Sequence, residues 1–171
     1  MKKLLVVVDY QNDFVDGALG FAQAREIEDA ICEKIEKYQE EGEVVYTLDT
    51  HTEEYEHTQE GRKLPVRHCL KGTHGHKVYG KAAKLLEGCR AFEKGIFGSD
   101  KFFDYLRAHP YDMIELVGVV SNICIISNAI LARTACPEAE IVVDHSCTAS
   151  NDSDMNQKAL EVMQGLQITV L

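Results

Sequence analysis

Three side chains that could share in covalent catalysis each lie at or just beyond the end of a predicted strand. They are Asp9, Lys94 and Cys124. A cysteine thiolate is a strong nucleophile, a nearby carboxylate can accept the proton of the thiol, and an ammonium can balance the negative charge that results. Together, the three residue types indicate acyl transfer through a thioester, provided that the fold brings them to one place.

Each of the three has a simpler interpretation, and the sequence alone leaves it open. Cys124 lies in a turn where Ser121 or Asn122 can cap a helix, so that backbone N–H groups favour a thiolate, although buried helix cysteines without a function are common. Asp9 ends an apolar run, where a carboxylate is costly unless it is paired, but aspartate also caps loops. Lys94 has a rival for the same role in Lys101.

A second group of residues has the composition of a metal site. Asp49 and His51 are two positions apart at the end of an apolar segment, so an extended backbone points both side chains the same way. His68 follows across a long connection, with His57 and Glu60 between. Such a set suits a divalent ion, zinc first and iron or manganese as alternatives. Solvated side chains on an acidic loop are the alternative interpretation.

The elements that would position these residues alternate along the chain. Short apolar runs predict strands, and apolar residues at helical spacing or a helical stop signal predict helices. Strands are expected at 4–8, 44–48, 89–93, 113–117, 140–143 and 167–171, and helices at 22–40, 101–109, 122–135 and 152–165. This alternation is typical of an α/β fold with a parallel sheet between helical layers, in which sites form at the carboxyl ends of the strands. A connection as long as that at about 49–80 is usually functional.

Composition narrows the class of protein. The 171 residues suit a single domain, here 1–171, and the formal net charge of −10 disfavours nucleic acid and anionic membranes as partners. No secretory signal or membrane-spanning run is evident, so we expect a cytoplasmic protein whose six cysteines are reduced.

Five segments of the sequence resemble motifs of the isochorismatase-like cysteine hydrolases, and within them of the nicotinamidase branch. In chain order they are Asp9-Tyr10-Gln11-Asn12-Asp13-Phe14, Asp49-Thr50-His51, His68-Cys69-Leu70-Lys71-Gly72-Thr73-His74-Gly75, Phe92-Glu93-Lys94-Gly95 and Gly118-Val119-Val120-Ser121-Asn122-Ile123-Cys124. The resemblance covers essentially the whole chain. It implies that Asp9, Lys94 and Cys124 are catalytic, and it favours Lys94 over Lys101.

The same resemblance implies further features. The sheet should have six strands in the Rossmann-like order 3-2-1-4-5-6, within three α/β/α layers, and the protein should be a homo-oligomer. Asp49, His51 and His68 should bind the metal, with Glu60 or His57 as the extra ligand. Backbone N–H groups of Val120 and Cys124 should form the oxyanion hole, after a Val119–Val120 peptide bond that is often cis in the family.

The substrate is less well defined than the chemistry. Nicotinamidases carry an aromatic residue shortly before the last metal histidine. In this chain, positions 65–67 are Pro, Val and Arg instead. The expected pocket is therefore built from other residues: Phe14, Phe21, Phe97 and Val119. The resemblance implies a metal-assisted cysteine amidohydrolase that converts nicotinamide to nicotinate and ammonia. A related hydrolase for another small amide, ureido or carbamoyl compound, and a non-catalytic metal-binding or sensor protein, are the alternatives.

Overall fold

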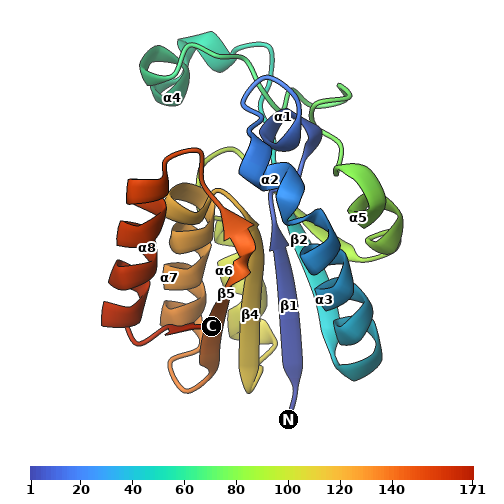
Figure 1. Cartoon of the computed structure of the whole chain (residues 1–171), viewed down its shortest axis with the longest axis vertical. Coiled ribbons are helices and arrows are strands. Elements are labelled where there is room, and N and C mark those ends of the chain that lie inside the picture. Colours follow the sequence, from blue (N-terminus) through green and yellow to red (C-terminus); the bar gives the residue numbers. More distant parts are fainter.

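A six-stranded parallel sheet forms the centre of the computed structural model, which describes residues 1–171 (Figure 1). The strands are β1 (Lys3–Val8), β2 (Glu43–Asp49), β3 (Arg90–Lys94), β4 (Met113–Val119), β5 (Glu140–Ala149) and β6 (Thr169–Val170). Their order in the sheet is β3-β2-β1-β4-β5-β6, which confirms the predicted order. The chain thus begins at the middle of the sheet, builds one half, and returns to β4 to build the other.

Helices cover both faces of the sheet, as predicted for a three-layer α/β/α fold (Figure 1). One layer contains α2 (Ala22–Glu26), α3 (Glu28–Glu41) and α5 (Gly80–Leu85), and the other contains α6 (Asp100–Ala108), α7 (Ile126–Ala135) and α8 (Ser153–Gly165). Side chains of β1 alternate between the two layers, so Leu5 and Val7 pack toward α3 while Leu4, Val6 and Val8 pack toward the other. This two-sided burial explains why the strand is apolar throughout.

The helices depart from the predicted pattern in several places, and two short helices, α1 (Asn12–Val15) and α5, were not predicted at all. The single helix expected over 22–40 is two helices, α2 and α3, which meet at Ile27. The long connection after β2 also has structure of its own, namely a 3-10 turn at Tyr55–His57 and the short helix α4 (Gln59–Lys63). In Figure 1 this connection lies beyond the end of the sheet that is opposite to the amino terminus. No helix in the structure has the length and apolar character that crossing a bilayer requires.

The strand register brings the predicted reactive residues together. Val8, the last residue of β1, pairs with Thr47 of β2 on one side and with Gly118 of β4 on the other, and Asp49 pairs with Lys94. Gly118 has a φ of 113°, and a Cβ atom there would lie 2.2 Å from the Val8 carbonyl oxygen. Only glycine allows β4 to approach β1 this closely at the point where the strand order reverses, which is where sites form in open α/β sheets.

Candidate active site

Asp9, Lys94 and Cys124 meet at the carboxyl end of the sheet, and all three are buried. The Lys94 ammonium lies 2.6 Å from the Asp9 carboxylate and 3.8 Å from the Cys124 sulfur. It also donates a hydrogen bond to the Ile96 carbonyl at 3.0 Å, which helps to fix its position. The rival lysine, Lys101, is exposed on α6. The structure therefore supplies a carboxylate, an ammonium and a thiol within direct reach of one another.

The Asp9 carboxyl group has the properties of a proton acceptor. Burial raises its pKa above the usual aspartate value, the positive charge of Lys94 opposes that rise, and the negative charge of Asp49 adds to it. Thr47 donates its hydroxyl to Asp9 Oδ1 at 2.6 Å and so also favours the ionised form. Sequence reasoning missed Thr47, although a polar side chain on the strand next to Asp9, within an otherwise apolar run, was a usable signal.

The Cys124 thiol and the Lys94 ammonium respond to the same surroundings in different ways. Burial raises the pKa of Cys124 well above its ordinary value, and the negative charge of Asp9 adds to the effect while Lys94 opposes it. Burial lowers the pKa of Lys94, but the charges of Asp9, Cys124 and Asp49 outweigh this, so the net shift is upward. The resting pair is therefore a protonated thiol beside a charged lysine, with a carboxylate ready to take the thiol proton.

The turn that carries Cys124 is wound more loosely than an α-helix. Residues Ser121–Ile125 form a π-helical turn, in which the Ile125 N–H donates to the Val120 carbonyl, five residues back. The peptide bond between Val119 and Val120 is cis, as the family resemblance implied. Widened turns of this kind often occur at functional sites. Cys124 was expected in the first turn of an α-helix, and it lies instead in this irregular segment before α7.

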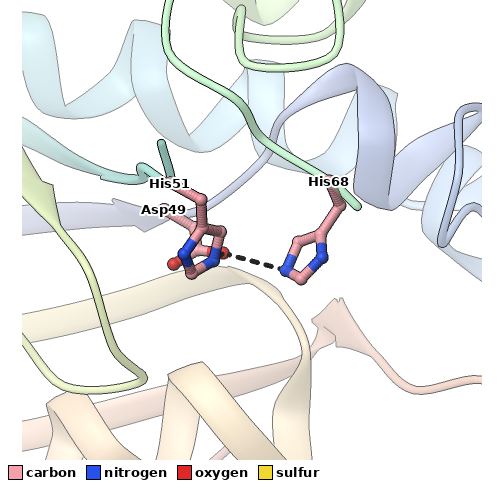
Figure 2. A group of neighbouring side chains, drawn as sticks. All are labelled: Asp49, His51 and His68. Carbon is pink, nitrogen blue, oxygen red and sulfur yellow. Dashed lines mark hydrogen bonds and ion pairs between the residues drawn. The ribbon is translucent and has the colours of Figure 1, made fainter. Parts of the chain in front are cut away.

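Asp49, His51 and His68 form the second cluster, and all are buried (Figure 2). One ligand atom from each lies within 4.8 Å of the others. His51 Nε2 and His68 Nε2 lie 2.8 Å and 3.3 Å from the Asp49 carboxylate. The remaining ring nitrogen of His68 donates to the Val66 carbonyl at 2.8 Å, which orients the ring. Two imidazoles and a carboxylate converging in this way could hold a divalent ion.

The two candidates for an extra ligand lie in different surroundings. Glu60 on α4 turns toward the cluster, with Oε1 3.9 Å from His51 Nε2 and 3.7 Å from His68 Nε2. Its second oxygen is buried without a hydrogen-bond partner, and burial together with the charge of Asp49 raises its pKa. A cation would relieve both the missing partner and the repulsion, so this donor set fits a metal. His57 is about four-fifths exposed and lies near Glu54 instead.

The segment after β1 holds in place the long connection after β2, which carries the candidate metal ligands, and the sequence did not reveal this role. Gln11 is fully buried, and its side chain accepts from the Asp49 N–H and donates to the carbonyls of Asp49 and His76. Asn12 donates to the carbonyl of His74, and Asp13 accepts from the N–H of Cys69. Three consecutive polar residues thus bind the main chain of the segments that carry the candidate ligands.

A cavity of about 210 Å³ opens onto both clusters. Its lining includes Cys124 together with Asp49, Glu60 and His68, and the remaining residues are Phe14, Leu19, Phe21, Leu64, Phe97, Val120, Ile123 and Asn151. The three predicted phenylalanines are among them. Val119 is not, because its side chain points into the core on the α3 side of β4, and the next residue, Val120, faces the cavity. Val119 is the last residue of β4, and the widened turn that begins just after it brings Val120 rather than Val119 to the cavity.

Comparisons with known proteins agree with this geometry. The family model described as the isochorismatase domain matches residues 3–171. The isochorismatase family protein PncA of Bacillus subtilis is 33% identical over 173 residues, which cover 94% of this chain and 93% of that protein. The nicotinamidase/pyrazinamidase of Mycobacterium tuberculosis is 26% identical, with 99% of this chain and 98% of that protein covered.

Solved structures show the same likeness. The crystal structure of the nicotinamidase/pyrazinamidase PncA from Bacillus subtilis has a TM-score of 0.90 at 28% identity, with 99% of each chain covered. The N-carbamoylsarcosine amidase of Thermoplasma acidophilum has a TM-score of 0.81 at 25% identity, with 99% of this chain and 95% of that chain covered. The family match, the strand order and the chemistry at the carboxyl edge of the sheet all lead to one conclusion: this chain belongs to the isochorismatase family.

Proposed function

We propose that the protein is a metal-assisted cysteine amidohydrolase that converts nicotinamide to nicotinate and ammonia. The observation that carries the proposal is the position of the Cys124 sulfur. It lies 3.8 Å from the Lys94 ammonium and next to the buried Asp9. It also lies at the wall of a cavity that the candidate metal ligands border. Relatives named nicotinamidases support the choice of substrate.

In the first half of the proposed reaction, the thiol proton of Cys124 moves to Asp9 while the sulfur attacks the carboxamide carbon. Lys94 balances the charge that passes between the two groups, and backbone N–H groups of Val120 and Cys124 hold the oxyanion. The tetrahedral species then collapses, the C–N bond breaks, and Asp9 gives its proton to the departing ammonia. A thioester on Cys124 remains.

In the second half, Asp9 takes a proton from a water molecule that attacks the thioester carbonyl. The C–S bond breaks, the acid is released, and Cys124 recovers its proton from Asp9. The residues proposed to hold a divalent metal are Asp49, His51, His68 and Glu60, and zinc is the first choice for this mixture of nitrogen and oxygen donors. When bound, such an ion supplies a Lewis acid that can orient a ring nitrogen or a bound water.

The cavity lining favours a neutral carboxamide over the alternative substrates. No lysine or arginine lines the cavity, and three phenylalanines, Phe14, Phe21 and Phe97, do. A substrate such as an N-carbamoyl amino acid carries a carboxylate, and the lining offers it no side-chain cation, so the proposed metal would be its only positively charged partner there. The likeness to N-carbamoylsarcosine amidase keeps a ureido compound as the second candidate. Flat, uncharged aromatic amides fit the phenylalanine walls better.

Ammonia release by the metal-reconstituted protein tests the proposal. We expect turnover of nicotinamide, much slower turnover of an N-carbamoyl amino acid, and no turnover of either by Cys124→Ala with its fold and metal content unchanged. A Cys124→Ala protein that still released ammonia would reject the covalent mechanism. Preference for the carbamoyl compound would transfer the assignment to the second candidate. Absence of turnover with every amide, together with an ordinary thiol reactivity, would support a non-catalytic protein.

We also propose that the protein is a homo-oligomer in the cytoplasm. All six cysteines are free, in keeping with a reducing compartment. Along α8 and its C-cap, Met155, Val162 and Leu166 are 42%, 52% and 42% exposed at near-helical spacing, and an apolar stripe of this kind is typical of a subunit contact. Light scattering after size-exclusion chromatography would give the mass in solution, and a monomer at every concentration would contradict the expectation.

A further inference from the structure

We propose that Asn128 is a positioning residue, which fastens the loop after β3 to the turn that carries Cys124. That loop, residues 95–99, follows Lys94 directly and carries Phe97, a wall of the cavity. The inference rests on the proposed function, because it assigns Asn128 a role in holding the proposed nucleophile Cys124 at a fixed position relative to Lys94 and Phe97.

Asn128 is an unusual residue for its place in the fold. It lies in the first turn of α7 and is fully buried, although asparagine is a poor helix former and a buried amide is costly unless its polar atoms are paired. Every polar atom of the side chain is paired here. The amide nitrogen donates twice, to the Cys124 carbonyl at 2.8 Å and to the Phe97 carbonyl at 3.1 Å, and Oδ1 accepts from the Ser99 N–H at 3.0 Å.

The partners of Asn128 are all main-chain groups, and they belong to two segments that no other side-chain amide joins. Cys124 lies in the widened turn, where the Ile125 N–H reaches back five residues, so the bond to the Cys124 carbonyl adds a constraint where helical pairing is irregular. The bonds to Phe97 and Ser99 hold the loop on the other side. One amide thereby links both segments.

The loop needs such a fastening because its own side chains do not bury it. Ile96 and Phe97 are 51% and 41% exposed, so packing alone gives the loop little rigidity. The Ile96 carbonyl accepts from the Lys94 ammonium, so a shift of the loop would also shift the lysine that faces the Cys124 sulfur. Displacement of reacting groups by about 1 Å can cost about 100-fold in rate. Loosening the loop should therefore lower both substrate affinity and the reactivity of Cys124.

Two substitutions of Asn128 remove different subsets of its three hydrogen bonds. Asn128→Asp keeps an acceptor for the Ser99 N–H but places carboxylate oxygen against two carbonyls. Asn128→Thr can still donate to the carbonyl four residues back, as Thr134 does to Ile130 at 2.8 Å on the same helix, and it loses both bonds to the loop. Thr134→Val is the matched control, because it removes one side-chain bond to a carbonyl of α7 at an exposed position.

The first measurement needs no amide substrate. Iodoacetamide labelling of the metal-loaded protein is followed for each cysteine by peptide mass spectrometry, with the partly exposed Cys89 as the reference thiol in the same sample. We expect the rate for Cys124 relative to Cys89 to fall about 10- to 100-fold in both Asn128 variants and to stay unchanged in Thr134→Val. Thermal unfolding of each variant confirms that the labelled protein is folded.

The second measurement separates the effect on substrate binding from the effect on the rate of reaction. With nicotinamide, Asn128→Thr should raise KM and lower kcat, each about 3- to 10-fold, because both Phe97 and Lys94 move. A folded Asn128→Thr protein with wild-type labelling and kinetics would overturn the proposal, and so would its failure to fold, which would assign Asn128 to stability alone. If wild-type protein does not hydrolyse nicotinamide but the labelling changes as expected, the substrate assignment fails and the positioning role stands.

Discussion

Replacing Lys94 with methionine tests whether the positive charge of Lys94 stabilises the Cys124 thiolate. Methionine is nearly as long and is uncharged, so Lys94→Met removes the ammonium with little change of volume. The ammonium lies 2.6 Å from Asp9 and 3.6 Å from Asp49, in addition to its 3.8 Å contact with the Cys124 sulfur. Its loss leaves buried carboxylates without their cation and leaves the thiolate without its counter-charge.

The distance to the sulfur gives the size of the effect. Two unit charges 3.8 Å apart interact by about 4 kcal/mol at an effective dielectric constant of about 20. Loss of this interaction corresponds to about 1,000-fold less Cys124 thiolate at a fixed pH. Asp9 would then hold its own proton more firmly, which removes part of the repulsion on the thiolate but also removes the proton acceptor. We expect kcat to fall by about 100-fold or more.

The assay compares initial rates of ammonia release and of Cys124 alkylation at one pH in four proteins: the wild type, Lys94→Met, a single-site control and a double variant. Lys101→Met is the matched control, since it removes an exposed lysine from α6 and should leave both rates unchanged. Breaking a buried ion pair can cost about 3–5 kcal/mol of stability. The double variant Asp9→Asn/Lys94→Met, in which both partners are neutral, therefore serves as a folded protein that should still be inactive. Wild-type rates in folded Lys94→Met would refute the reasoning.

The other predictions concern the metal, the pH dependence and the backbone. Glu60→Gln should weaken zinc binding by about 10-fold or more, whereas His57→Ala should leave it unchanged, as measured by competition with a chromophoric chelator. Activity requires ionised Asp9, so it should fall as the pH drops through a pKa that burial has raised above the usual aspartate value. Thr47→Val, which removes a bond to the ionised form, should move the acid limb of kcat/KM to higher pH, and an unmoved limb would exclude Asp9 as its source. Gly118→Ala should lower the free energy of unfolding by about 3 kcal/mol or more in urea titrations, because the added Cβ meets the main chain of β1.

The parallel sheet and the meeting of Asp9 with Lys94 follow from local features of the sequence, whereas the order of the strands was implied by the family resemblance. An apolar run before Asp9 and a weaker strand signal before Lys94 predicted the two strands and the edge at which their polar ends meet. Parallel strands share one carboxyl edge, so the convergence needed no knowledge of the side-chain contacts. The same reasoning placed Asp49 beside His51, because alternate residues of an extended strand face the same way.

Other parts depend on contacts between segments that are distant in sequence. The choice between Glu60 and His57 was open because both lie in one connection, and only the packing of α4 over the metal cluster turns Glu60 inward. The pocket role predicted for Val119 failed because the start of the widened turn decides which valine faces the cavity. Asn128 gave no signal either, since its partners are main-chain atoms 29 and 31 residues away in the loop.

The catalytic cluster and the candidate metal cluster interact electrostatically, because the Lys94 ammonium lies close to a carboxylate of each. Asp9, Asp49 and Glu60 are largely buried carboxylates, and Lys94 is the one ammonium beside Asp9 and Asp49, so three carboxylates face a single lysine. Buried charge of that size is costly unless it is compensated, and a divalent cation bound by Asp49 and Glu60 would cancel it. Moving the thiol proton of Cys124 to Asp9 then transfers a negative charge from one side of Lys94 to the other without changing the total. The site can thus create its nucleophile inside a buried, low-dielectric cavity, because no net charge has to be buried at that step.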